Sequence, residues 1–274
     1  MANYTAADIK ALREKTGAGM LAVKKALDEA DGDMEKAHEI IRIKGLKGIA
    51  KREGRSTSEG VVAVDVRPGG EGQQGTMIEI NCETDFVAKS GPFIEIADKA
   101  VAYAAENGIT DPAELTSGDF SQTFTDATAP LGEKVVIRRL AQVSGEHVEV
   151  YLHRTSPDLP PQVAVMVATD AAGAEVARDV AMHIAAYSPN YLSREDVPEE
   201  TVADERRIVE ETSRNEGKPE QALPKIIEGR MNGFFKENCL LDQAFARDPK
   251  KTVGQIVEGS GGKVTAFARF RVGA

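Results

Sequence analysis

An internal repeat limits the possible folds of this chain more than any other feature. The segments GTMIEINCETD (75–85) and PPQVAVMVATD (160–170) align at a constant offset of 85 residues. Aligned apolar residues recur at every second position, Ile78, Ile80 and Cys82 in the first segment and Val163, Val165 and Val167 in the second, which is the period of a strand with one face on a core. Each is followed by an alanine-rich amphipathic helix, at 96–105 in the first copy and 176–186 in the second. The chain should therefore contain two copies of one strand–helix unit.

Further strands complete each copy. A strand precedes each repeat segment through a turn, at 59–66 and 147–154, and another follows each helix, at 135–143 and 263–272. We therefore expect an α+β core of two repeated subdomains, each an antiparallel sheet covered by a helix. The strand-to-helix turn of the first copy is five residues longer than that of the second.

The N-terminal part reads as three short helices within residues 4–44, separated by TGAG (16–19) and Asp31-Gly32. From Arg42 to Arg55 the chain holds six Lys/Arg, one acid and three glycines. This composition predicts a helix end that passes into a solvated linker. We expect three domains: a three-helix head with its basic linker (1–55), a first core subdomain (56–145) and a second (146–274).

The second copy carries an insertion, residues 195–237, between its helix and its last strand. Two helical segments, 199–216 and 219–235, are joined by Gly217-Lys218 and predict a protruding antiparallel helical hairpin. Such a hairpin offers a surface for homodimerisation. The apolar residues expected to face one another across it are Val202, Ile208, Val209, Leu223, Ile226, Ile227 and Met231.

Charge and cysteine usage exclude several classes of protein. A net charge of −10 opposes generic binding to nucleic acid, which depends on Lys and Arg. The two cysteines form neither a disulfide framework nor a metal-binding spacing. The first residues resemble no targeting segment, and the longest apolar run is six residues, at 163–168. We expect a cytoplasmic protein without membrane contact or cofactor.

Enzyme templates fit poorly. GSGGKV (259–264) lacks the first glycine and the Ser/Thr of a phosphate-binding loop. The four histidines occupy separate elements, so no metal site is expected. Cys82 shares the strand parity of Ile78 and Ile80 and should point into the core, where a thiol behaves as a small apolar group. We predict no covalent catalysis.

The longer turn of the first copy, ETDFVAKSGPF (83–93), is the strongest candidate site, because extra residues at a connection often serve a surface function. Phe86 beside Asp85 could act as a wedge, with the ring in an apolar slot of a partner and the carboxylate near a cationic or metal site. The alternative is that Phe86 packs on its own sheet while Asp85 caps the turn. The residues alone leave both open.

Five segments, in this order and spacing, resemble the bacterial translation elongation factor Ts family over nearly the whole chain. They are TGAGMLAVKKAL (16–27), NCETDFVAK (81–89), AMHIAA (181–186), EGRM (228–231) and DPKKTVGQIV (248–257). The resemblance implies a ubiquitin-associated-like head and a two-subdomain core with a coiled-coil hairpin. It also implies guanine-nucleotide exchange on elongation factor Tu, in its GDP-bound and nucleotide-free forms, without covalent chemistry.

The resemblance also implies roles for individual residues. The family's TDFV segment, here Thr84, Asp85, Phe86 and Val87, is implicated in dislodging Mg²⁺ from the partner's nucleotide site. Contacts to the partner are further implied for the head, at Gly17, Gly19, Met20 and Lys24, and for His153 at the start of the second subdomain.

Three other functions remain as alternatives. A small-molecule enzyme would need a nucleophile–base pair, which the sequence does not offer. An RNA-binding module would use the basic residues 42–55 and lose affinity steeply with salt. A partner of elongation factor Tu that binds without promoting exchange differs only in nucleotide-release kinetics.

Overall fold

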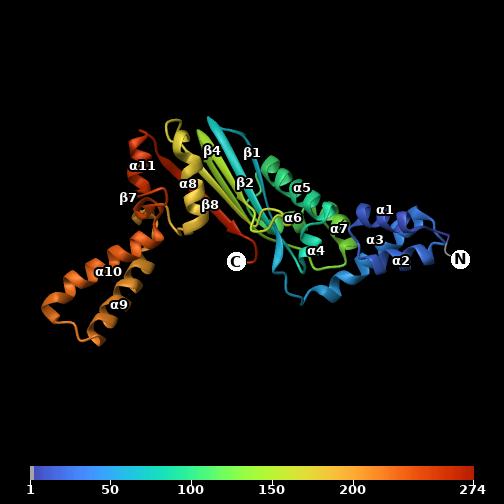
Figure 1. Cartoon of the computed structure of the whole chain (residues 1–274), viewed down its shortest axis with the longest axis horizontal. Helices are drawn as coiled ribbons and strands as arrows, with labels where there is room; N and C mark the ends of the chain where they lie inside the picture. Colours follow the sequence, from blue (N-terminus) through green and yellow to red (C-terminus); the bar gives the residue numbers. More distant parts are fainter. Residues whose placement is uncertain (1–2) are drawn as a thin grey trace.

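The repeat appears as two three-stranded antiparallel sheets in the computed structural model, which describes residues 3–274 (Figure 1). The first sheet has the order β1 (Glu59–Gly69), β2 (Gly72–Cys82), β3 (Val136–Gly145), and the second has the order β4 (His147–His153), β5 (Val163–Thr169), β8 (Val264–Arg271). The repeat segments are the central strands, β2 and β5, so the predicted α+β class and strand pairing are confirmed.

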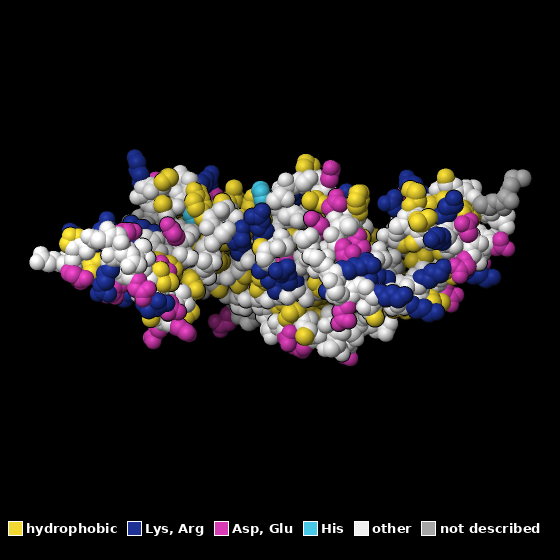
Figure 2. Space-filling model, turned by 90° about the horizontal axis from the view of Figure 1, so that it is seen from below, with side chains coloured by type: hydrophobic (Ala, Val, Ile, Leu, Met, Phe, Trp, Pro, Cys, Tyr) yellow, Lys and Arg dark blue, Asp and Glu magenta, His cyan; other side chains and the backbone are white. Residues whose placement is uncertain are grey.

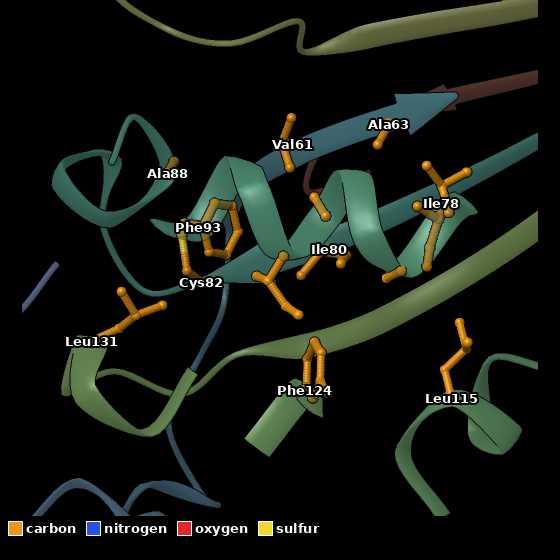
Figure 3. Packing of buried hydrophobic residues seen from close by; sticks show 14 of the residues in the cluster. Val61, Ala63, Ile78, Ile80, Cys82, Ala88, Phe93, Leu115, Phe124 and Leu131 are labelled. Atoms are coloured by element: carbon orange, nitrogen blue, oxygen red, sulfur yellow. The ribbon is translucent and has the colours of Figure 1, made fainter. Parts of the chain in front are cut away.

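Each sheet buries one face under its own helices. On β2, Ile78, Ile80 and Cys82 pack against Phe93 and other apolar residues of α5 (Gly91–Asn107), as Figure 3 shows. Shorter helices close this first core: α6 (Pro112–Ser117), α7 (Ser121–Thr128) and η1 (Ala129–Leu131). In the second copy, β5 packs on α8 (Ala174–Tyr187), with α11 (Val253–Gly259) and the small hairpin β6 (Ala244–Phe245) and β7 (Asp248–Thr252) beside it.

The opposite faces of the two sheets pack on each other. Met77 of β2 and Val143 of β3 meet Ala164 and Met166 of β5 in a common apolar cluster. Strand alternation explains this arrangement, because neighbouring residues of a central strand point into different cores. The core is therefore layered as helix, sheet, sheet, helix.

The head is a three-helix unit of α1 (Ala6–Thr16), α2 (Met20–Glu29) and α3 (Met34–Arg52). Thr5 and Asp8 form a capping box at the start of α1, and Asp33 caps α3. Leu12, Val23 and other apolar residues fill the head's small core.

The prediction of a linker after Arg42 is wrong, because α3 continues to Arg52 and packs on the first core copy. Gly45 makes this contact possible: a Cβ there would lie 2.2 Å from the Ala129 carbonyl oxygen. The Arg42 guanidinium also pairs with Asp126 of α7 at 2.6 Å. Figure 2 shows dark blue Lys and Arg side chains over the head and over its junction with the core.

The inserted hairpin consists of α9 (Glu199–Asn215) and α10 (Leu223–Asn238) and projects from the end of the molecule opposite the head (Figure 1). Val209, Leu223 and Met231 form its apolar seam. Ile208 does not join them, contrary to expectation: it is 48% exposed, one position outside the seam. Within the described part of the chain, none of the helices combines the length and apolar character that crossing a bilayer requires.

Candidate functional site

The longer turn of the first copy forms a one-turn helix, α4 (Asp85–Ala88), directly after β2. Its most prominent residue is Phe86, whose side chain is 68% exposed. The alternative in which Phe86 packs on its own sheet is therefore wrong. We call Asp85, Phe86 and Lys89 the tip.

The two other residues of the TDFV segment serve the fold. Thr84 is the N-cap of α4, and its hydroxyl accepts a hydrogen bond from the Val87 amide. Val87 and Ala88 are buried in the first core, where Ala88 lies near Phe93 (Figure 3). Val87 and Ala88 belong to the longer turn, which is expected to serve a surface function, but both side chains are buried and contribute to the first core.

Lys89 connects the polar and apolar parts of the tip. Its ammonium lies 3.2 Å from the Asp85 carboxylate and 4.7 Å from the centre of the Phe86 ring. The Asp85 side chain is 47% exposed. The tip thus presents an aromatic ring and a carboxylate side by side, with a cation between them.

Carboxylates fix the base of the tip. Glu133, which lies between η1 and β3, accepts hydrogen bonds from the Glu83 and Thr84 amides, each at 2.9 Å, and from the Thr84 hydroxyl. In return, Glu83 accepts from the Lys134 amide at 2.6 Å and from the Arg55 guanidinium at 3.2 Å. Sequence reasoning missed Glu133, because about 50 residues separate it from the turn and it belongs to no motif.

The head and the tip meet at one groove of about 790 Å³. Gly17, Ala18 and Gly19 of the head line one side, and Thr84 and Phe86 line the other. The fold therefore brings together two segments that the sequence separates by more than 60 residues.

The head residues expected to contact a partner differ in how far the fold itself constrains them. Gly17 is fixed by the fold, since it ends α1 with a φ of +67° and a Cβ there would lie 2.5 Å from the Leu131 side chain. Gly19 begins α2 and is uncrowded. Met20 and Lys24 lie one turn apart on α2, and both are exposed.

His153 lies apart from the groove, at the end of β4 in the second sheet. It is exposed, and its ring nitrogen Nδ1 lies 3.2 Å from the Tyr151 hydroxyl. The structure therefore places the expected contact residues in two regions, the head–tip groove and the end of the second sheet.

Cys82, the last residue of β2 before the turn, is fully buried. Burial raises the pKa of the Cys82 thiol far above its usual value, and the charge of the nearby Glu133 raises it further. Such a thiol stays protonated and unreactive at neutral pH. Across residues 3–274, no group of three or more His, Cys, Asp or Glu side chains could hold a metal ion.

Comparisons with known proteins agree on one family. A family model described as "Elongation factor TS" matches residues 83–274. The protein named Elongation factor Ts from Beutenbergia cavernae is 66% identical over 281 residues, and the alignment covers all of both chains. Those of Renibacterium salmoninarum and Micrococcus luteus are 62% and 61% identical, again over the full length of both chains.

Proposed function

The chain belongs to the elongation factor Ts family, which functions in translation elongation, and from this premise we propose that it is the guanine-nucleotide exchange factor of elongation factor Tu. It would bind the GDP-bound partner, dislodge its Mg²⁺, stabilise the nucleotide-free form and so allow GTP to bind. No covalent chemistry is needed. Because translation takes place in the cytoplasm, we propose that location for the protein.

The exposure of Phe86 on a firmly held turn is the observation that carries the proposal. An exposed phenylalanine ring gains free energy when an apolar slot takes it up, and aromatic anchors of this kind dominate many interfaces. Asp85 next to it can approach the partner's bound cation.

Exchange through this tip follows from how GTPases hold nucleotide. Backbone amides cradle the phosphates and Mg²⁺ bridges them, so spontaneous release is slow because both interactions must fail together. If Phe86 separates elements of the partner while Asp85 disturbs the metal's ligands, the Mg²⁺ contacts and the phosphate contacts can be lost one after the other instead of together. Each reduction of the barrier by about 1.4 kcal/mol speeds release about tenfold.

The remaining contacts would orient the tip. Gly19 lines the groove, and the exposed Met20 and Lys24 follow it on α2. All three can contact the same domain of the partner as Phe86. His153, on the second sheet, would reach another domain. Homodimerisation through the α9–α10 hairpin remains a proposal that rests on its projection from the core.

Thermodynamic linkage limits what such a factor can do. If its binding weakens GDP, then GDP binding must weaken the factor to the same extent, and the same holds for GTP. The factor therefore equilibrates the two nucleotides, and the excess of GTP in the cell sets the direction.

Nucleotide-release kinetics separate this proposal from its main alternative, a partner that binds without promoting exchange. The experiment follows release of a fluorescent GDP analogue from elongation factor Tu by stopped flow, in excess unlabelled GDP, with catalytic amounts of this protein. We expect one molecule of the protein to accelerate release from many molecules of the partner. Binding without acceleration would establish the non-exchanging alternative.

A further inference from the structure

We propose that Glu133 is a positioning residue for exchange, because it holds the tip in the geometry that presents Phe86 and Asp85 to the partner. This inference rests on the proposed function. Glu133 itself does not lie in the TDFV segment, and the family resemblance assigns it no role.

The hydrogen bonds of Glu133 carry the proposal. A single carboxylate receives three donors from the first residues of the turn: the Glu83 amide, the Thr84 amide and the Thr84 hydroxyl. Bonds from N–H or O–H groups to an ionised carboxylate are roughly twice as strong as neutral ones. They fix the backbone immediately before α4, and with it the direction in which Phe86 projects.

Glu133 also connects the tip to the head. Its main-chain carbonyl accepts a hydrogen bond from the Arg52 guanidinium at 3.2 Å, and Arg52 donates to the Gly45 carbonyl within α3 at 2.9 Å. The Arg52 side chain is mostly buried at this junction. The segment that holds the tip is therefore attached to the helix that carries the head, so the two sides of the groove keep a fixed spacing.

A second carboxylate reinforces the arrangement from the other side. Glu83 belongs to the turn and accepts from the amide of Lys134, the residue after Glu133. The turn and the 133–134 segment thus each supply a carboxylate to the backbone amides of the other. Such reciprocal pairing restrains both position and rotation, whereas one bond would act as a pivot.

A glutamine at position 133 would disrupt this pattern. The Glu83 and Thr84 amides donate to one carboxylate oxygen and the Thr84 hydroxyl donates to the other. A neutral glutamine side chain has a single acceptor oxygen, so it cannot accept all three bonds: its NH₂ group must face either the two amides or the hydroxyl. The turn would then sample other orientations while Val87 and Ala88 keep it attached to the core. Because misplacement of a reacting group by about 1 Å can cost on the order of a hundredfold in rate, release should suffer more than binding.

The experiment measures two quantities for Glu133→Gln: the maximal rate of GDP release at saturating protein, and the concentration that gives half this rate. We expect the maximal rate to fall by about tenfold or more, with a much smaller change in the half-saturating concentration. The matched control is Glu146→Gln. Glu146 likewise accepts a hydrogen bond from a turn amide, that of Ala171 at 2.9 Å, but this turn belongs to the second copy. This control should release GDP like the wild type.

A double-mutant cycle distinguishes positioning from a general structural role. If Glu133 acts through the ring of Phe86, Glu133→Gln should cost little further rate in a Phe86→Ala background. A purely structural role would lower the rate by the same factor in both backgrounds. That result, or an unchanged maximal rate in Glu133→Gln alone, would overturn the proposal.

Two further measurements apply if Glu133→Gln fails to fold. Glu83→Ala removes the carboxylate that accepts from the Lys134 amide, and we expect a loss of maximal rate in the same direction. In the wild-type protein, the amides of Glu83 and Thr84 should exchange slowly with deuterium; rapid exchange would show that the bonds to Glu133 do not persist. If wild-type protein does not accelerate release at all, the proposed function fails, which is distinct from failure of this inference.

Discussion

The two strand-to-helix turns begin with the same residues, yet they close in different ways. Thr84-Asp85 in the first copy corresponds to Thr169-Asp170 in the second. The Asp170 carboxylate accepts from the amides of Gly173, at 2.8 Å, and Lys263, at 2.9 Å, and so closes its own turn.

In the first copy this task belongs to other residues. Glu83 takes the amide of Lys134, which like Lys263 lies just before the last strand of its sheet, and Glu133 takes the amides at the base of the turn. Asp85 is therefore not needed to close its turn as Asp170 is. The added residues form α4, in which Phe86 is exposed. The comparison teaches that a turn residue of the same framework becomes free for a surface role when neighbouring carboxylates close the turn instead.

The largest predicted effect on stability concerns two phenylalanines, Phe86 in α4 and Phe93 at the start of α5. Phe93 is fully buried, so Phe93→Ala should lower the free energy of unfolding by about 3–5 kcal/mol. Phe86→Ala removes an exposed ring and should leave stability nearly unchanged. Urea unfolding followed by circular dichroism measures both. If Phe86→Ala instead lowered the melting temperature by well over about 5 °C, Phe86 would be a core residue and the wedge would be excluded.

A smaller difference in stability is expected between variants of the two corresponding aspartates, Asp170 and Asp85. Asp170→Ala leaves the amides of Gly173 and Lys263 without their carboxylate acceptor and should lower the melting temperature clearly. Asp85→Ala removes only a contact with Lys89 and should lower it less. Thermal denaturation of both variants in the same buffer measures the difference. An equal loss in both would show that the two turns close alike.

The pH dependence of stability should carry the signature of Asp170. Hydrogen bonds from the Lys263 and Gly173 amides lower the pKa of its carboxyl in the folded state. A depressed folded-state pKa contributes stability above the unfolded value of about 4, and this stability is lost as the pH falls through the lower folded value. Asp170→Asn lacks the contribution, so its stability deficit relative to wild type should be constant near neutral pH and shrink below about pH 4. A deficit that does not change with pH would contradict this.

The smallest predicted effect belongs to Lys89. Its ion pair with Asp85 joins two side chains that are 38% and 47% exposed, and such pairs contribute less than about 1 kcal/mol. Lys89→Ala should therefore change the urea midpoint only slightly. A large loss would mean that the tip depends on its own ion pair rather than on Glu133 and Glu83.

Periodicity predicted much of the fold because it records burial directly. The alternation around Ile78 and Val165 located both central strands, and the helical hairpin followed from its two apolar faces. Composition was less informative. Glycines and lysines after Arg42 suggested a linker, whereas Gly45 lies within α3 at a point where the helix packs so closely on Ala129 that a Cβ would not fit.

The candidate site was predicted only in part. Phe86 could be singled out because it lies in a stretch of the turn that the second copy lacks, but only the structure shows that its ring is exposed. Neither Glu133 nor the meeting of head and tip could be predicted, since both depend on tertiary contacts between distant segments.

Stopped-flow release of a fluorescent GDP analogue from elongation factor Tu, with wild type, Phe86→Ala and Met182→Ala compared, tests the central claim most directly. Met182 is an exposed apolar residue of α8 in the second copy, 42% exposed, and serves as the matched control. We predict that Phe86→Ala loses on the order of tenfold or more of the acceleration while Met182→Ala keeps it. If Phe86→Ala accelerated release as well as the wild type, the tip would not be the exchange site.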